Sequence, residues 1–357
     1  MKKADDLKNI NTPIKYQTYQ FGGFNFSIGS DGFDTVDDFL VEDLITRNSF
    51  GVVYGPSSSL KTFFTLDLAA SIACGLNWGD RSVISGGVVY VAAEGQRGIA
   101  KRIRAFELVN NKLTRHLFVL GQSIIMSDKG DSKKLVEAVR EIEDEFNIKV
   151  ELVVIDTLAR CFDGDENQVH DMTPFIRACE YVQTSTDTTV LCVHHSGHND
   201  KHGARGSTAL RGACDFEFKV KRNGKVKAKT TTLSNTKQKD CDEAPDIKIE
   251  FDLVDLGIRC KKNKPIMSLA RVKPLITLEE NEESNSPILL ILMEKLSGRA
   301  TVDELKKALF KTNTPLTASQ RKQFSRDIKK LKEEGRIRIE QANESRISAT
   351  DMIYVCH

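Results

Sequence analysis

The sequence has 357 residues, of which 40% are apolar and 29% charged, with a formal net charge of +2. This composition is typical of a globular protein with a large core, and the length suggests two domains. The balanced charge argues neither for nor against a nucleic-acid partner. No run approaches the ~18 apolar residues of a membrane span, and the opening MKKADDLKNI lacks the apolar core of a signal peptide, so we expect a cytoplasmic protein with no membrane partner.

The first two thirds of the chain predict an α/β core. Residues 1–34 are polar apart from the Gly/Phe-rich patch FGGFNFSIGSDGF, and we expect an arm or an edge hairpin there. Residues 35–275 alternate between strand and helix patterns. Strand-like runs lie at 49–54, 86–94, 117–120, 150–156 and 188–195, and helical patterns at 63–74, 97–108 and 131–146. Short Val/Ile-rich runs separated by helices are typical of a mainly parallel sheet covered on both faces.

A different pattern begins near residue 225. The short alternating segments KVKAKTTTL, IKIEFDLVD and IRCKK predict a meander that closes the sheet. The acidic and polar stretch 276–286, ITLEENEESNS, is the best candidate for a linker.

Residues 287–357 have the pattern of a small separate domain. A first helix, SPILLILMEKLSG, precedes two capping boxes, Thr301 with Glu304 and Thr317 with Gln320, and the third helix ends at Gly335. Two short β segments follow, so the order predicts a winged-helix-like domain. The third helix has one apolar face (Phe324, Ile328, Leu331) and many cations (Arg321, Lys322, Arg326, Lys329, Lys330, Lys332). The cations form either a solvated face or a contact with nucleic acid or a partner.

A phosphate-binding pattern lies between the first strand and the first helix of the core. It consists of Gly55, Pro56, Ser57, Ser58, Ser59, Leu60, Lys61 and Thr62. In the Walker A loop that this context predicts, amides and a helix N-terminus face phosphate oxygens, Lys61 reaches the β/γ-phosphates of ATP, and Thr62 ligates Mg²⁺. Leu60 replaces the usual glycine before the lysine and must adopt the loop conformation without the freedom of glycine.

Three polar residues end other predicted strands, at the edge where open α/β sheets bind ligands. Asp156 ends VELVVID and is the expected Walker B carboxylate in the Mg²⁺ shell. Glu94 ends GGVVYVAAE, where a carboxylate can orient and deprotonate a water molecule. His195 ends VLCVHH and can contact the γ-phosphate. The predicted catalytic set is therefore Glu94, Lys61, Asp156 and His195.

The density of histidines after residue 193 also raises a zinc site as an alternative. His194, His195, His198 and His202 lie near Cys192. Along a strand Cys192 and His194 share one face while His195 points to the other, and no second cysteine cluster completes a site. The eight cysteines include no CxxC pair, so we expect reduced and mostly buried thiols.

Together these motifs resemble the RepA-like hexameric helicase/ATPase family of plasmids and phages, within the RecA/DnaB-type P-loop motors. The resemblance covers about 35–260 and is carried by five segments: GPSSSLKTFFTLDLAASIACGLNWGDR, GGVVYVAAEGQRGIAKRIRAF, LVVIDTLARCFDGDENQVHDM, VLCVHHSGHNDKHGARGSTALRG and TKQKD.

The resemblance implies a RecA-like P-loop core in a homo-oligomeric ring of six protomers, with ATP and Mg²⁺ at the interfaces. It implies that Glu94 is the catalytic base, Asp156 the Walker B acid and His195 the γ-phosphate sensor. Lys237 and Lys239, in TKQK, resemble the basic pair that reaches the neighbouring subunit's ATP. The second position is Lys239, where the pattern usually has arginine, and lysine lacks the planar fork of that residue. Arg205 and Arg211 compete for this trans-acting role.

The favoured function is an ATP-driven replicative DNA helicase of a mobile element that translocates on single-stranded DNA, with a replication initiator or primase as a further partner. The polar stretch SGHNDKHGARGSTALRG either lines the channel against the DNA backbone or is a simple interface loop. Two alternatives stay open: an ATPase switch or loader that recruits other proteins without unwinding, and a regulator whose winged helix binds duplex DNA. Strand exchange and P-loop kinase activity fit the pattern less well.

Overall fold

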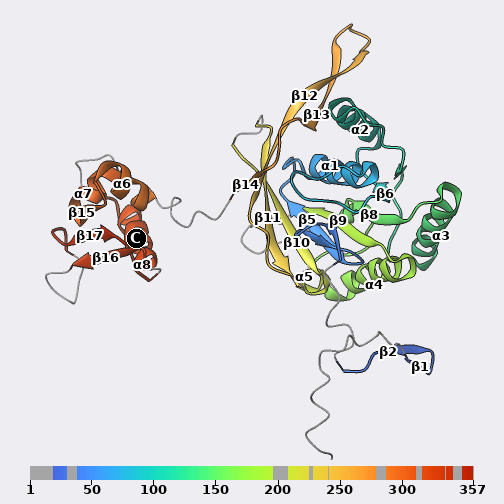
Figure 1. Ribbon diagram of the computed structural model, residues 1–357, viewed down its shortest axis with the longest axis horizontal. Helices are drawn as coiled ribbons and strands as arrows, with labels where there is room; N and C mark the ends of the chain where they lie inside the picture. Colours follow the sequence, from blue (N-terminus) through green and yellow to red (C-terminus); the bar gives the residue numbers. More distant parts are fainter. Residues whose placement is uncertain are drawn as a thin grey trace, which may run out of the picture. The chain divides into compact units, whose positions relative to one another are not determined.

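The computed structural model describes residues 19–29, 38–195, 208–224, 228–239, 241–278, 287–310, 316–333, 335–340 and 348–356. The chain forms two compact units, Met1–Thr277 and Leu278–His357 (Figure 1).

A ten-stranded mixed sheet forms the centre of the first unit. Its order is β13-β12-β11-β10-β5-β9-β8-β6-β7, with β14 paired to β12. The parallel part consists of β5 (Phe50–Gly55), β6 (Gly87–Ala92), β7 (Leu117–Leu120), β8 (Val150–Asp156), β9 (Thr189–His195) and β10 (Phe216–Arg222). The antiparallel part consists of β11 (Thr230–Gln238), β12 (Ile247–Arg259), β13 (Pro265–Arg271) and β14 (Ile276–Thr277). The predicted α/β fold with a mainly parallel sheet and a closing meander is confirmed.

Helices cover both faces of this sheet (Figure 1). One face packs against α1 (Lys61–Cys74) and α2 (Gln96–Asn110), and the other against α3 (Lys129–Phe146) and α4 (Val169–Thr186). Neighbouring strand residues such as Val52 and Val53 enter opposite cores because side chains alternate along a strand. A short α5 (Thr208–Ala213) leads into β10. No helix in the described ranges is long and apolar enough to cross a membrane.

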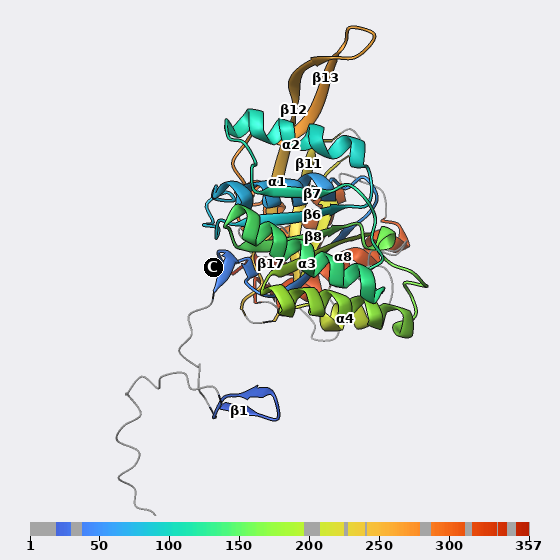
Figure 2. The same ribbon diagram turned by 90° about the vertical axis from the view of Figure 1, so that its right-hand side faces the viewer.

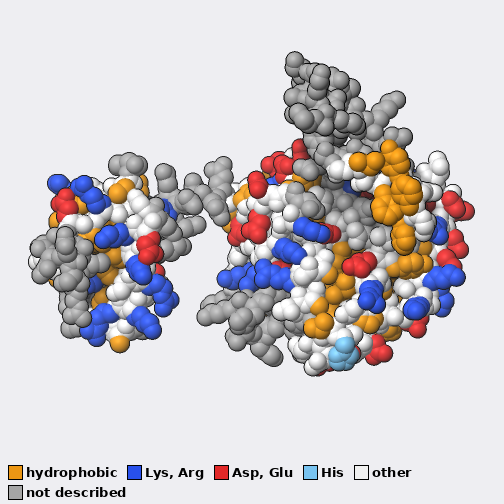
Figure 3. Space-filling view, turned by 90° about the horizontal axis from the view of Figure 1, so that it is seen from below, with side chains coloured by type: hydrophobic (Ala, Val, Ile, Leu, Met, Phe, Trp, Pro, Cys, Tyr) orange, Lys and Arg blue, Asp and Glu red, His pale blue; other side chains and the backbone are white. Residues whose placement is uncertain are grey.

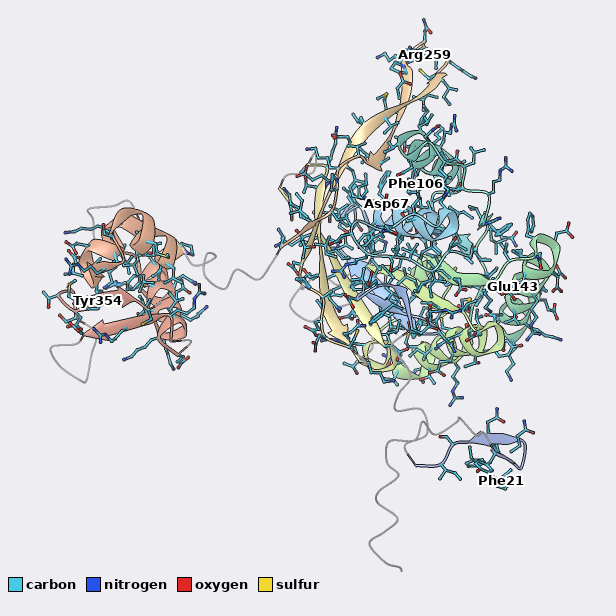
Figure 4. The ribbon with its side chains drawn as sticks, in the orientation of Figure 1. Phe21, Asp67, Phe106, Glu143, Arg259 and Tyr354 are labelled. Atoms are coloured by element: carbon cyan, nitrogen blue, oxygen red, sulfur yellow. The ribbon has the colours of Figure 1, made fainter. Side chains whose placement is uncertain are left out.

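The hairpin of β12 and β13 extends beyond the rest of the sheet and lies beside α2 (Figures 1 and 2). Leu256 and Ala270 pack on Ala105 of α2 in a small core of their own. At the base of the hairpin Arg271 Nε donates to Asp67 Oδ2 of α1 at 2.7 Å. The indole of Trp78 donates to the same oxygen at 2.9 Å. The region around Asp67 therefore joins α1 to the antiparallel part of the sheet (Figure 4).

Two small sheets precede the core strands. Among the strands that the structure describes, β1 (Tyr19–Phe21) and β2 (Phe24–Phe26) pair only with each other, so this hairpin is not an edge of the large sheet. β3 (Phe39–Val41) and β4 (Ile45–Thr46) form the second pair.

The second unit combines three helices with a three-stranded sheet of order β15-β17-β16. Its elements are α6 (Pro287–Lys295), β15 (Arg299–Thr301), α7 (Val302–Phe310), α8 (Ala318–Glu333), β16 (Ile337–Glu340) and β17 (Met352–Val355). Phe324, Ile328 and Leu331 of α8 belong to its buried core. Both capping boxes are reciprocal: the Thr301 amide donates to Glu304 at 2.8 Å, and the Thr317 amide donates to Gln320 at 2.9 Å. The assignment to the winged-helix class stays a prediction.

Candidate active site

The parallel strands place four predicted site residues at one edge of the sheet. β5, β6, β8 and β9 run in the same direction, so their carboxyl ends lie together. Gly55 is the neighbour of His195 across β5 and β9, and Ala92 is the neighbour of Asp156 across β6 and β8. The loop that follows β5 therefore meets the ends of β8 and β9 and the segment after β6.

The phosphate-loop segment has backbone requirements that explain two of its residues. A Cβ on Gly55 would lie 2.1 Å from the carbonyl oxygen of Val220, so only glycine fits beside β10. Leu60 has φ +73° and ψ +20°, the left-handed conformation that glycine adopts most easily. Its side chain is 8% exposed and packs in the α1 core, so burial offsets the backbone cost.

Lys61 lies at the first position of α1 with its ammonium folded back on the loop. Nζ donates to the carbonyl oxygens of Gly55 at 2.8 Å and Pro56 at 2.9 Å. Burial of the ammonium lowers the pKa of Lys61 to about 8, although the carboxylates of Asp156 and Glu94 oppose the shift. An anion in the loop would give this buried charge a stronger partner than two carbonyls.

Asp156 is almost fully buried at the end of β8. Its Oδ2 accepts a 2.6 Å hydrogen bond from Tyr90, whose hydroxyl also lies 3.0 Å from Thr65 Oγ1. Its Oδ1 has no well-formed hydrogen bond, although the Thr62 hydroxyl is near enough to stabilise the charged form. Burial raises the pKa of Asp156, and the hydrogen bonds from Tyr90 and Thr62 oppose the rise. A buried carboxylate oxygen without a partner, next to a threonine hydroxyl, is a suitable position for a hard cation.

Glu94 and His195 border the same loop. Glu94 is exposed just after β6, and its Oε2 accepts from Thr157 Oγ1 at 3.3 Å. His195 Nδ1 lies 3.4 Å from Lys61 Nζ and 3.5 Å from Ser57 Oγ. Burial, and then the charge of Lys61, lower the pKa of His195, which favours the neutral imidazole. The histidine therefore contacts both the lysine and the serine-rich part of the loop.

The zinc alternative has no support in the part of the chain that the structure describes. No group of three His, Cys, Asp or Glu side chains there could hold a metal ion. The Sγ of Cys192 lies 4.0 Å from that of Cys179, in the buried core. His198 and His202 lie outside the described residues. Five of the eight cysteines are buried as free thiols.

The candidate trans-acting cations lie at the other end of the strands. Glu217, at the start of β10, is the neighbour of Lys237 and of Val52. Lys237 Nζ donates to the carbonyls of Arg211, Gly212 and Cys214, and so caps the end of α5. Arg211 forms an ion pair with Glu217 at 3.4 Å, and Lys239 with Asp215 at 3.2 Å. Val52 comes three residues before Gly55, and a strand rises about 3.3 Å per residue, so these cations lie roughly 10 Å or more along the strand direction from the loop of their own chain. Arg205 is outside the described residues.

Three residues of the site escaped the sequence analysis. Tyr90 supports Asp156, Arg222 Nη1 donates to the Ser58 carbonyl at 3.0 Å, and Thr231 Oγ1 donates to the Ser59 carbonyl at 3.2 Å. Arg222 and Thr231 come from β10 and β11, more than 150 residues after the loop. The only local signal was a tyrosine within the apolar run GGVVYVAAE, and in the structure it lies two residues before Ala92, the strand neighbour of Asp156.

The part of the chain that holds the site matches a known protein family. Residues 26–201 match a family model described as an AAA domain, and this range contains the loop, Glu94, Asp156 and His195. The crystal structure of the RadB recombinase aligns with 58% of this chain and 88% of its own, with 13% sequence identity and a TM-score of 0.41. No curated protein matches the chain. The first unit has an α/β P-loop core.

Proposed function

We propose that this protein is a RecA-like ATPase that binds ATP with Mg²⁺ and hydrolyses it. The observation that carries the proposal is that the buried Lys61 ammonium and the buried Asp156 carboxylate lie at the same edge of the sheet. Both are charged groups with too few partners, and a Mg²⁺-nucleotide would complete both.

Each residue has a chemical role in this proposal. Lys61 would exchange the Gly55 and Pro56 carbonyls for oxygens of the β- and γ-phosphates. Thr62 and the free Oδ1 of Asp156 would hold Mg²⁺, which would supply positive charge against the phosphates. The loop amides and the N-terminus of α1 add further positive potential.

Glu94 is the proposed general base. Its carboxylate is exposed and is oriented by the Thr157 hydroxyl, so it can accept a proton from the attacking water. His195 would contact the γ-phosphate from its position between Lys61 and Ser57. Loss of that contact after hydrolysis would be transmitted to the segment after β9.

Two substitutions test the site. Lys61→Ala should abolish ATP binding and turnover, because the loop would lose the charge that holds the phosphates. Glu94→Gln should bind ATP with wild-type affinity and reduce kcat by about 10²- to 10⁴-fold, the usual contribution of a general base.

Binding of a fluorescent ATP analogue and phosphate release would be measured side by side. Glu180→Gln, on the exposed surface of α4, is the matched control and should have normal turnover. Full activity of Lys61→Ala would remove the site model, and full activity of Glu94→Gln would place the base elsewhere.

We further propose that the ATPase is a ring-forming motor, a replicative helicase of a mobile element acting on single-stranded DNA. The resemblance to RepA-like helicases supports this proposal. So does the placement of Arg211 and Lys239, which pair with Glu217 and Asp215 away from their own loop and would act on a neighbour's nucleotide. Lys237 is the weaker candidate because it already caps α5. The winged-helix-like second unit would contact nucleic acid or a replication initiator or primase.

The ATPase rate per protomer, measured against protein concentration with and without single-stranded DNA, separates the motor from its rival. A rate that rises with concentration and increases with DNA supports a ring motor, and unwinding of forked DNA is then the decisive assay. A slow rate from a monomer, indifferent to DNA, would instead support an ATPase switch or loader that recruits other proteins.

A further inference from the structure

The free end of the β12–β13 hairpin has an unbalanced positive charge. Residues 256–266 contain four cations and no acidic residue, although Lys and Arg nearly equal Asp and Glu in the whole chain (52 and 50). The four cations are Arg259, Lys261, Lys262 and Lys264, here called the hairpin tip, and all are exposed. No ion pair or side-chain hydrogen bond involves any of them within the described ranges. Figure 4 shows Arg259 at the end of the hairpin, away from the body of the unit.

Contacts with α1 and α2 anchor the hairpin that carries this tip. Leu256 and Ala270 pack on α2, and Arg271 pairs with the buried Asp67. Two apolar side chains of the hairpin, Ile258 and Met267, are 51% and 39% exposed. The hairpin thus presents a cationic tip beside apolar side chains that nothing in the described unit covers.

A surface with the opposite properties lies on α3. Residues 137–146 contain five acidic residues and one arginine, a net charge of −4. A shallow hollow on this helix is lined by Ala138, Glu141, Ile142, Asp144, Glu145 and Phe146, here called the α3 surface. Phe146 is 50% exposed, and on the side of the core where α3 lies Figure 3 shows acidic side chains among hydrophobic and basic ones.

The charge on α3 is unfavourable for the isolated helix. Asp144 and Glu145 lie in its last turn, which has no basic residue. The C-terminus of a helix carries a partial negative charge, so carboxylates there are destabilising and a cation would stabilise them. Glu141, Asp144 and Glu145 have no ion pair within the described ranges, whereas Glu143 pairs with Lys149 at 3.2 Å. The α3 surface therefore gains from a cationic partner.

We infer that the hairpin tip of one copy docks on the α3 surface of a second copy. Four unpaired cations and two exposed apolar residues meet three unpaired carboxylates and an exposed phenylalanine. Figure 4 places Arg259 and the α3 residue Glu143 on different sides of the core. Two different surfaces in contact make a head-to-tail interface, which closes into a ring or extends into a filament. The inference rests on the proposed ring and names two of its contacting surfaces.

Charge reversal tests the pairing in the full-length protein. The tip-reversed variant carries Lys261→Glu, Lys262→Glu and Lys264→Glu, and the surface-reversed variant carries Glu141→Lys, Asp144→Lys and Glu145→Lys. Each alone should need at least about a tenfold higher concentration to assemble, because like charges at an interface are strongly unfavourable. An equimolar mixture should assemble at the wild-type concentration, since each reversed tip then meets a reversed surface.

The matched control reverses three exposed cations of α8, Arg321→Glu, Lys322→Glu and Arg326→Glu, and should assemble like the wild type. Assembly would be measured by light scattering with and without a non-hydrolysable ATP analogue. An unchanged melting temperature would establish that each variant is folded.

Cys260, an exposed cysteine within the tip, provides a direct measurement. Glu141→Cys should give a ladder of cross-linked protomers with a short bis-maleimide, and the ladder should disappear in the Cys260→Ser background. Rings that assemble normally with a reversed tip and give no ladder would overturn this interface and leave the ATPase and ring proposals standing. Protection of Cys260 by single-stranded DNA with no ladder would assign the tip to nucleic acid and overturn the inference. A protein that stays monomeric in all conditions would overturn both the ring and this interface.

Discussion

Leu60 combines two opposing effects at a single residue. Its left-handed backbone costs about 1–2 kcal/mol for a residue with a Cβ, while its side chain is buried against α1. The sequence predicted the difficulty because a glycine usually precedes the lysine of such a loop. The structure shows the compensation, which depends on packing that no local pattern specifies.

We expect the order of two substitutions at this position to reveal the backbone cost. Leu60→Ala and Leu60→Gly should both lower the free energy of unfolding, since both remove a buried side chain. Leu60→Gly should nevertheless be more stable than Leu60→Ala by about 1 kcal/mol, because glycine alone avoids the left-handed penalty. Urea unfolding measures the difference.

Leu68, in the interior of α1, is the control. There Ala should be more stable than Gly by about 1 kcal/mol, the usual order in a helix. The same order at both positions would mean that the loop conformation is not strained.

The site shows what residue patterns can and cannot predict. The common location of the loop, Asp156, Glu94 and His195 could be predicted because each follows or ends a recognisable strand, and parallel strands share one carboxyl edge; their roles stay predictions. The contribution of Tyr90 could not be predicted, because its hydrogen bond to Asp156 depends on the pairing of β6 with β8. Arg222 and Thr231 are still further from the loop in sequence, and only the closed sheet brings them to it.

Among the elements, the β12–β13 hairpin depends most on one buried ion pair. Arg271 at its base and Asp67 in α1 are 13% and 5% exposed. Burial raises the pKa of Asp67, and the charge of Arg271 opposes the rise. Removal of the guanidinium would leave a buried carboxylate whose charge only Trp78 stabilises.

Arg271→Met should therefore lower the free energy of unfolding by about 3 kcal/mol near neutral pH, as for other broken buried pairs. The pKa of Asp67 should rise further, so the folded state binds a proton more readily than the unfolded state. Its carboxyl then destabilises the fold above the unfolded pKa, and protonation relieves this at acidic pH.

Denaturant unfolding of wild type and Arg271→Met at pH 7.5 and pH 4.5 tests this dependence, and the difference should be smaller at pH 4.5. Adding Asp67→Asn to Arg271→Met should remove the pH dependence of the difference. A difference that grows at low pH would contradict the assignment of the effect to Asp67.

Element prediction succeeded where periodicity is strong and was less complete elsewhere. The core strands and α1, α2 and α3 lie where their patterns predicted. The sequence analysis did not single out α4, which contains Pro174, or β10, whose run FEFKVKR alternates with lysines. The segment IRCKK was expected to be a strand, but β12 ends at Arg259 and the chain turns there, with the Cys260 amide donating to the Lys264 carbonyl. The sequence pattern had divided this region into two segments, IKIEFDLVD and IRCKK. In the structure β12 continues from the first into the second, with a register shift after Asp255 and with Gly257 at φ +73°.

For the whole molecule, the presence of two units with separate cores predicts two unfolding transitions. Thr317→Ala removes the capping box of α8 and should lower the stability of the second unit alone by about 1 kcal/mol. A non-hydrolysable ATP analogue with Mg²⁺ should stabilise the first unit alone, by about 2.7 kcal/mol at 100 times its dissociation constant.

Differential scanning calorimetry of wild type, Thr317→Ala and the nucleotide-bound protein distinguishes the two transitions. The substitution and the nucleotide should shift different peaks. Peaks that move together in either experiment would mean that the two units unfold as one.

The position of Trp78 has a spectroscopic consequence. It is the single tryptophan of the chain, is fully buried, and donates its indole hydrogen to Asp67. Its fluorescence should therefore be that of an indole in a dry environment and should shift to longer wavelength only when the first unit opens. Because the second unit has no tryptophan, tryptophan emission reports the unfolding of the first unit alone. Circular dichroism reports the unfolding of both units. The transition that appears in circular dichroism but not in fluorescence therefore belongs to the second unit.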